Sequence, residues 1–260
     1  MAKLAHVSIE DTIASVTGKT PVQMSRLSGG CIGDIYRVRF NDGESLVAKV
    51  DETGCAKLHV EGDMLLFLAT KTGLLVPQVV HNSDTLLLME YVDGGDFVDS
   101  KVEDHAATLL ADLHRISAES FGFEYDTLIG GLHQPNPRYS SWVKFFAEQR
   151  IGYMARTAYD ANRMPASSLK RFEAFAAQVG KFIEEPSHPS LIHGDIWGGN
   201  VLARNGKIAA FIDPAIYYAH PEIELAFITL FSTFGRHFFD AYNELFGIRP
   251  GFFEERRDIY

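Results

Sequence analysis

The segment Leu191–Leu202 constrains this chain more than any other part of its sequence. It reads as a short apolar strand, then a His-Gly-Asp turn ending at Asp195, then Asn200 five residues later. A second apolar segment, 208–212, follows and leads directly into Asp213. Carboxylate and amide oxygens are the ligands that Mg²⁺ prefers, and this ion is usually shared with substrate phosphates. The spacing therefore predicts two neighbouring turns that hold a magnesium–nucleotide complex.

This layout matches a kinase catalytic loop and the metal-binding aspartate that follows it. In that template the first aspartate accepts the proton of a substrate hydroxyl, so Asp195 is the candidate catalytic base. Asn200 and Asp213 are the candidate ligands of Mg²⁺. His193 is expected to brace the loop through hydrogen bonds, because the template gives the proton-transfer role to the aspartate.

The composition is that of an ordinary globular protein. The 260 residues are 46% hydrophobic and 22% charged, which is enough for a substantial core and two lobes. The net charge is −10 and no run of Lys or Arg occurs, which disfavours a nucleic-acid partner. The first residues lack the long apolar region expected of a signal peptide, and no apolar run has membrane-spanning length. Cys31 and Cys55 have neither disulfide nor metal-ligand spacing, so the cytoplasm is the expected location, away from any membrane.

The pattern of the chain changes at residues 93–96, Asp-Gly-Gly-Asp. The part before it favours strands over 22–27, 35–40, 45–50, 79–80 and 85–92, with helices from Ser8 and over 56–70. The part after it favours helices over 103–116, 141–158, 167–184, 221–234 and 252–260. The sequence therefore predicts an α+β fold of two lobes. An antiparallel-sheet lobe over 1–92 would bind nucleotide, and a mainly helical lobe over 93–260 would carry the catalytic loop and the substrate. The last helical pattern reaches Tyr260 without a stop signal, so a further C-terminal segment is expected to be missing.

The first lobe offers candidate phosphate-binding residues in a glycine-rich turn and a following strand. Gly29, Gly30 and Cys31 join two strands, where backbone N–H groups could approach phosphates, although an ordinary hairpin turn has the same composition. Lys49 ends a Val-Ala-Lys pattern typical of the strand whose lysine reaches the α- and β-phosphates, although an exposed strand lysine would look alike. Glu61 on the next helix could hold Lys49 as an ion pair, with Asp63 as a rival.

Three further residues complete the expected ATP site. Met89, Glu90 and Tyr91 precede the glycine-rich linker and could offer backbone groups to the adenine edge, or could simply form a buried edge strand. None of these features is specific alone. Their order along the chain is the stronger signal: glycine turn, lysine, helix glutamate, linker, catalytic loop and metal-binding aspartate.

The ordered set resembles the protein-kinase-like fold in its small-molecule, aminoglycoside-phosphotransferase-like branch, and within it the fructosamine (ketosamine-3-) kinase family. The matching segments span nearly the whole chain: Ser28–Ile32, Val60–Gly62, Met89–Tyr91, Gln134–Asn136, Ser141–Phe146, His193–Asn200, Asp213–Ala215 and His220–Ala226. Trp197, in the pattern H-G-D-x-W-x-G-N, is the detail that best separates the chain from aminoglycoside and choline kinases. Two departures concern substrate preference: Thr127 stands where members tend to have Asn, and Glu224 where Asp is common.

The resemblance implies an ATP- and Mg²⁺-dependent enzyme that phosphorylates the sugar O3 of a ketoamine, free or bound to protein. Such a ketoamine, whether a ribulosamine, erythrulosamine or fructosamine, is the Amadori product of an amine and a sugar, and its 3-phosphate breaks down, which gives a deglycation role. Trp197, Tyr217, His220 and Glu222 are the expected substrate-side residues, with core packing or helix charge as the alternatives. A monomer and a dimer are both compatible with the sequence.

Three other functions stay open on the sequence alone. The first is another small-molecule kinase, acting on an aminoglycoside, choline or a thio-sugar. The second is a pseudokinase that binds nucleotide without transfer, although Lys49, Asp195, Asn200 and Asp213 argue against it. The third is a protein kinase, which the seven residues between Asp213 and Pro221 disfavour because they leave no room for an activation segment. Cys31 could also be an oxidisable thiol in a positive field, or a small apolar filler.

Overall fold

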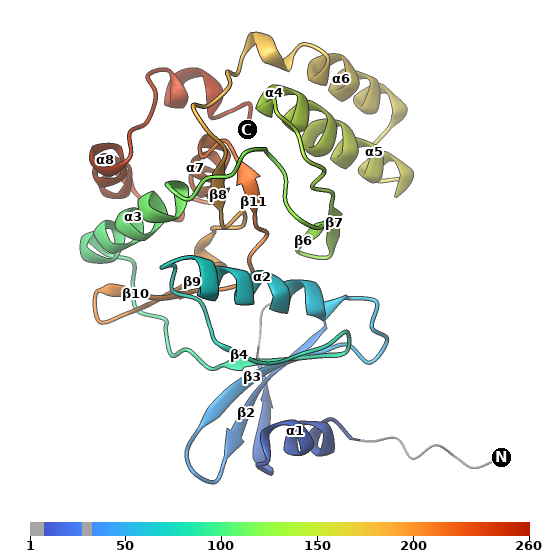
Figure 1. Cartoon of the computed structure of the whole chain (residues 1–260), viewed down its shortest axis with the longest axis vertical. Helices are drawn as coiled ribbons and strands as arrows, with labels where there is room; N and C mark the ends of the chain where they lie inside the picture. The colour runs from blue at the N-terminus through green and yellow to red at the C-terminus, as the bar shows by residue number, and fades with distance from the viewer. Residues whose placement is uncertain (1–7, 28–32) are drawn as a thin grey trace, which may run out of the picture.

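The computed structural model describes residues 8–27 and 33–260, with a sheet at one end of the molecule and most of the helices at the other (Figure 1). The sheet has five antiparallel strands in the order β1-β2-β3-β5-β4. Its strands are β1 (Pro21–Arg26), β2 (Asp34–Phe40), β3 (Ser45–Val50), β4 (Val79–Asn82) and β5 (Leu86–Glu90). All the strands expected before the glycine-rich linker therefore form, with small shifts at their ends.

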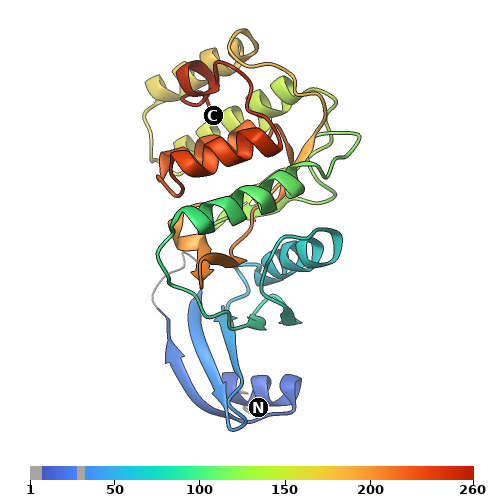
Figure 2. The same ribbon diagram turned by 90° about the vertical axis from the view of Figure 1, so that its left-hand side faces the viewer.

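Two helices pack on this sheet, α1 (Ile9–Thr17) and α2 (Leu58–Lys71). Helix α1 begins where the Ser8 hydroxyl accepts a hydrogen bond from the backbone N–H of Asp11 (3.1 Å), and it ends at a left-handed Gly18. Helix α2 contacts β4 and β5 of the sheet and also β6 of the helical half. It therefore lies between the two halves of the molecule, as both ribbon views show (Figures 1 and 2).

The rest of the chain is mainly helical. Its α-helices are α3 (Ser100–His114), α4 (Trp142–Phe145), α5 (Tyr153–Asp160), α6 (Ala166–Ala176), α7 (Glu222–Leu230) and α8 (Arg236–Leu245). The helix expected over 141–158 forms, but its middle, Phe146–Gly152, is wound as the π-helix η1. The helix expected over 167–184 ends early and is followed by the 3₁₀ turn η2 (Val179–Lys181), where Gly180 has low helix propensity. The pattern over 252–260 gives only the π-helical turn η4 (Phe252–Arg256), and α8 was not predicted.

Three two-stranded ribbons lie among the helices and position the candidate site. They pair β6 (Thr127–Ile129) with β7 (Leu132–Gln134), β8 (Ser190–Ile192) with β11 (Tyr217–Ala219), and β9 (Val201–Arg204) with β10 (Lys207–Phe211). The segment 193–200 connects β8 to β9, and Asp213 lies between β10 and β11. The last two ribbons, which lie near α2 in Figure 1, therefore bring both predicted turns to one place.

The main hydrophobic core fills the helical half, and two smaller clusters lie where α1 and α2 meet the sheet. No helix in the described part of the chain is both long and apolar enough to cross a membrane. The α+β fold with an antiparallel N-terminal sheet and a mainly helical C-terminal half is confirmed. The division of the lobes between residues 92 and 93 stays a prediction.

Candidate active site

Lys49 lies at the centre of a buried ion-pair cluster between the two halves of the molecule. Its Nζ lies 2.7 Å from Glu61 Oε1 on α2 and 2.7 Å from Asp213 Oδ1, and its side chain is 8% exposed. Burial alone would lower the pKa of Lys49, but the two carboxylates outweigh burial and raise it. Burial raises the pKa of Glu61. The structure pairs Lys49 with Glu61, whereas the rival Asp63 accepts a hydrogen bond from Asn82 Nδ2 (2.8 Å).

The predicted catalytic loop folds so that Asp195 and Asn200 contact each other. Asn200 Nδ2 donates to both the backbone oxygen and Oδ2 of Asp195, at 2.9 Å each. Burial raises the pKa of Asp195 to about 6, and the negative charge of Asp213 contributes to the rise. Asp213 lies beside the same turn, because the N–H of the preceding Ile212 donates to the backbone oxygen of Asn200 (3.0 Å).

His193 braces this loop, as the sequence predicted. It is fully buried, its Nδ1 accepts a hydrogen bond from the Asp195 N–H (3.3 Å), and its backbone oxygen accepts one from Ala215 N–H (2.7 Å). Burial lowers the pKa of His193, so the ring stays neutral and can act as the acceptor. The loop is thereby tied to the segment that follows Asp213.

Asn200 and Asp213 are adjacent through the backbone, since the N–H of Ile212 donates to the oxygen of Asn200 (3.0 Å). Asp213 has φ of 54°, a left-handed conformation that aspartate tolerates better than most residues. No group of three His, Cys, Asp or Glu side chains with metal-site geometry occurs within 8–27 and 33–260. One amide and one carboxylate oxygen nevertheless fit Mg²⁺, which commonly takes one or two protein ligands beside nucleotide phosphates.

A second layer of buried polar groups supports the loop, and the sequence did not reveal it. The Gly194 N–H donates to Glu224 Oε1 (2.6 Å), and Glu224 Oε2 contacts His114 Nε2 (2.8 Å). The other ring nitrogen of His114 contacts the Tyr242 hydroxyl (2.6 Å). Gly194 is needed here, because φ is 88° and a Cβ would lie 2.2 Å from the backbone oxygen of Ala215. His114 carries no local sequence signal, since its partner is 110 residues away.

A cavity of about 580 Å³ lies beside the catalytic loop in the helical half. Ile192, Gly194 and Tyr217 line it, together with residues of α5, α6 and α7. Tyr217 is thus where a substrate-side residue would be expected. Trp197 is 41% exposed and packs against Phe231 at the surface rather than in this cavity.

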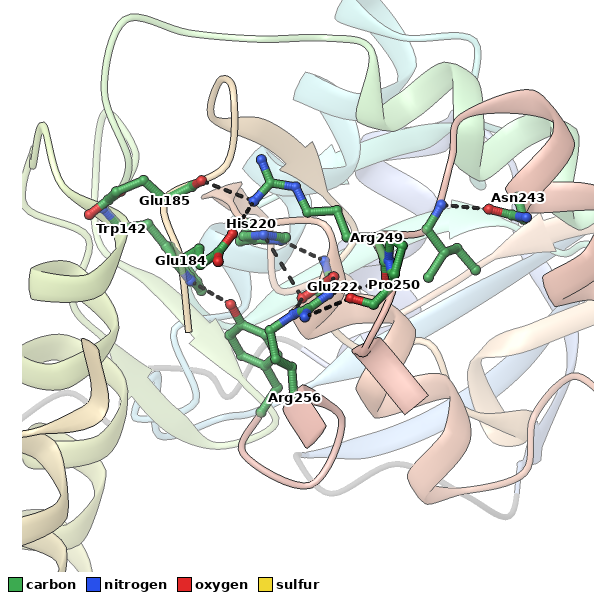
Figure 3. Close-up of polar contacts among 11 residues, drawn as sticks. Trp142, Glu184, Glu185, His220, Glu222, Asn243, Arg249, Pro250 and Arg256 are labelled. Atoms are coloured by element: carbon green, nitrogen blue, oxygen red, sulfur yellow. Dashed lines mark hydrogen bonds and ion pairs between the residues drawn. The ribbon is translucent and has the colours of Figure 1, made fainter. Parts of the chain in front are cut away.

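The structure does not bring His220 and Glu222 to that cavity. Both line a different, smaller cavity of about 250 Å³, on the side of the molecule shown in Figure 3. Glu222 is 3% exposed and is held by Arg256, whose Nη2 and Nε donate to its two oxygens at 2.6 and 2.8 Å. The backbone N–H of Glu222 donates to His220 Nδ1 (3.1 Å), and burial lowers the pKa of His220 to about 3. Both side chains therefore make their polar contacts with other residues of this chain.

The remaining nucleotide-site candidates lie at the linker and in the glycine-rich turn. Met89 is buried at the end of β5, Glu90 is exposed, and Tyr91 stacks under the Arg37 guanidinium (3.8 Å to the ring centroid). The linker then contacts β9 through the N–H of Gly95, which donates to Ala203 (3.1 Å). Gly29, Gly30 and Cys31 lie outside the described residues, so their predicted roles and the redox role of Cys31 stay predictions.

The chain is similar to known proteins over nearly its whole length. The family model for fructosamine kinase matches residues 5–260. A probable ketoamine kinase of Vibrio parahaemolyticus is 32% identical, with 90% of this chain and 82% of that protein covered. The chloroplastic protein-ribulosamine 3-kinase of Arabidopsis thaliana is 28% identical, with 100% of this chain and 81% of that protein covered.

Solved structures agree with the sequence comparison. The crystal structure of a "putative fructosamine-3-kinase" of Thermobifida fusca has a TM-score of 0.82 and 31% identity, covering 94% of this chain and 86% of that one. The aminoglycoside phosphotransferase APH(2")-IIa, solved with gentamicin, has a TM-score of 0.63 at 17% identity, covering 100% and 85%, which shows the shared fold alone. The chain therefore belongs to the fructosamine kinase family of phosphotransferase enzymes, as its motifs indicated.

Proposed function

We propose that this chain transfers the γ-phosphate of ATP to the O3 hydroxyl of a ketoamine sugar. The observation that carries the proposal is one connected site, in which Lys49, paired with Glu61, contacts Asp213 beside the Asp195–Asn200 turn. These are the parts that phosphoryl transfer uses for positioning and charge neutralisation. Family membership and the names of the relatives, a ketoamine kinase and a ribulosamine 3-kinase, support a ketoamine as the acceptor.

Each residue then has a chemical role. Asp195 orients the O3 hydroxyl and accepts its proton as the new O–P bond forms and ADP leaves. Lys49, fixed by Glu61, neutralises the ATP phosphates. Mg²⁺, held by Asn200 and Asp213, would supply further positive charge where negative charge develops on the transferred phosphoryl group.

The remaining roles are assigned only from where these residues lie in the chain or in the structure. Met89, Glu90 and Tyr91 would contact the adenine, and the turn at Gly29, Gly30 and Cys31 the phosphates. Tyr217 would line the acceptor site and Trp197 its outer edge, whereas the committed contacts of His220 and Glu222 argue against substrate roles for them. Breakdown of the 3-phosphate would release the sugar, which gives a deglycation role in the cytoplasm.

An acceptor panel tests this function. Purified enzyme with Mg·ATP is offered ribulosamines, erythrulosamines, fructosamines, aminoglycosides and choline, and ADP release is measured. Turnover confined to the ketoamines is the expected result. Turnover confined to an aminoglycoside or choline would make the chain another small-molecule kinase, and ATP binding without any transfer would make it a pseudokinase.

A further inference from the structure

Arg150 is a buried cation in the wall of the 580 Å³ cavity, and the proposed phosphoryl transfer does not use it. It lies in the π-helical segment η1, and only 8% of the residue is exposed. A π-turn inserts an extra residue into a helix and re-aims its side chains, and such turns occur frequently at functional sites. The cavity wall next to the catalytic loop therefore holds a positive charge at an irregular turn.

The groups that accept hydrogen bonds from Arg150 are neutral. Its Nη1 donates to the backbone oxygens of Pro135 (2.9 Å) and Gln149 (3.2 Å), and its Nη2 donates to Asn136 Oδ1 (2.6 Å). Its Nε is buried without a hydrogen-bond partner, and no Asp or Glu of the described residues forms an ion pair with it. A buried charge is normally paired, because taking it out of water is costly. Arg150 thus lacks the counter-ion that a structural buried arginine usually has.

Aromatic rings fix the plane of this guanidinium. Its central carbon lies 3.9 Å from the centroid of the Tyr217 ring and 4.6 Å from that of Phe145. Tyr217 also lines the cavity, and its strand β11 pairs with β8, which leads into the catalytic loop. The cation of η1 is therefore stacked against the ribbon whose strand β8 leads to Asp195.

The rest of the cavity is mainly apolar. Its other lining residues include Ile151, Met154, Phe172, Phe227 and Ile259. Glu224 also borders it, but both oxygens of Glu224 already have partners, Gly194 and His114. The cavity thus combines an apolar wall with one unpaired positive charge.

We propose that this cavity holds the amine part of a ketoamine made from a free apolar α-amino acid, with its α-carboxylate paired to Arg150. This inference rests on the proposed function and names the class of its acceptor. In such an adduct the carboxylate is one carbon away from the sugar-bearing nitrogen, beside the apolar side chain. A lysine adduct on a protein has four methylene groups at that place and no carboxylate, so Arg150 would stay unpaired.

Two acceptors that differ only in the carboxylate test the inference in the wild-type enzyme. They are the ketoamine of leucine and that of 3-methylbutylamine, each prepared with ribose and with glucose. A charged hydrogen bond of this kind predicts a kcat/KM about tenfold to a hundredfold higher for the leucine adduct, mainly through KM. Equal kcat/KM values would overturn the inference and leave the proposed function standing. Lack of turnover of every adduct would contradict the proposed function, and the inference with it.

Variants then assign the preference to Arg150. Arg150→Gln should reduce the ratio of the two kcat/KM values to near one, and Arg150→Lys should retain part of it. Arg156→Gln is the matched control, because Arg156 lies nearby in α5 but is exposed and paired with Glu173. Arg156→Gln should keep the wild-type ratio. A folded Arg150→Gln enzyme that still prefers the leucine adduct by the wild-type ratio would refute the role of Arg150.

Discussion

The Lys49 cluster and the Glu222–Arg256 pair are both buried and charged, but only the second is balanced. At Lys49 one ammonium faces two carboxylates, Glu61 and Asp213, so a negative charge remains. At Glu222 one carboxylate faces one guanidinium through two hydrogen bonds (Figure 3). A balanced buried pair is complete without a ligand, whereas an unbalanced buried cluster is a candidate ligand site. The proposed phosphoryl transfer therefore uses the first region, whereas the second has the contacts of a structural pair.

Asp195→Asn should have the largest effect on the catalytic side of this comparison. The amide keeps the shape of the side chain but cannot accept the hydroxyl proton, so kcat should fall by about a thousandfold or more. ATP affinity and Tm should change little. Steady-state kinetics measure kcat, nucleotide titration measures the ATP affinity, and thermal unfolding measures the Tm. Asp112→Asn, which removes an exposed carboxylate paired with Arg115, is the control and should be active.

Lys49→Met should also reduce activity far more than stability. Removing one positioned donor to the phosphates is expected to lower kcat/KM by about a hundredfold to a thousandfold. The fold should tolerate the change, because burial already raises the pKa of Glu61 and this carboxyl can take up a proton. Lys19→Met provides the control, since Lys19 is an exposed lysine paired with Asp42. If Lys49→Met kept wild-type kcat/KM, Lys49 would not be a phosphate ligand.

Glu222→Gln should show the opposite pattern, a loss of stability with normal catalysis per folded molecule. Removing one partner of a buried pair leaves Arg256 uncompensated, which should cost about 3 kcal/mol of the free energy of unfolding. The Tm should fall by roughly 6–12 °C for a chain of this size. Thermal unfolding and kcat at low temperature are the measurements. A large fall in kcat with an unchanged Tm would return Glu222 to the substrate side, as the sequence first indicated.

Ser8→Ala should have the smallest effect of these substitutions, because Ser8 lies far from both charged regions. It removes the hydrogen bond that begins α1, at a cost of about 1 kcal/mol. Chemical denaturation should detect this loss, and kcat/KM should be unchanged. Ser8→Asp, which can still cap the helix, should restore the stability. A change in kcat/KM with Ser8→Ala would mean that α1 is coupled to the site.

The sequence predicted which residues of the Lys49 region lie close together, but not the contacts of the Glu222 region. Asp195, Asn200 and Asp213 lie within one short segment, so local spacing and the order of strands placed them together. Lys49 and Glu61 were found because a strand and the following helix are adjacent in the chain. In contrast, the pair of Glu222 with Arg256 leaves no local signal, because the two residues are 34 positions apart.

The rest of the fold depended on contacts that local patterns do not contain. The π-turn at Arg150 inserts one residue into a helical period that looks regular in the sequence. Helix α8 was missed, although Phe238, Phe239 and Tyr242 are buried in it, since these aromatic residues fit a helix or a strand equally. His114 supports Gly194 through Glu224, over a separation of 110 residues to its carboxylate partner. Long-range polar contacts of this kind leave no spacing signal.

Phosphorus NMR of a single reaction mixture tests the proposed reaction most directly. Wild-type enzyme with Mg·ATP and the ribose adduct of leucine should give ADP and one new phosphate monoester in equal amounts, with coupling that places the phosphate on sugar C3. Asp195→Asn should give neither product. Spectra are taken from the first minutes, before the 3-phosphate breaks down. ADP and inorganic phosphate with no sugar phosphate at these earliest times, or a phosphate on another sugar oxygen, would contradict the proposed ketoamine 3-kinase.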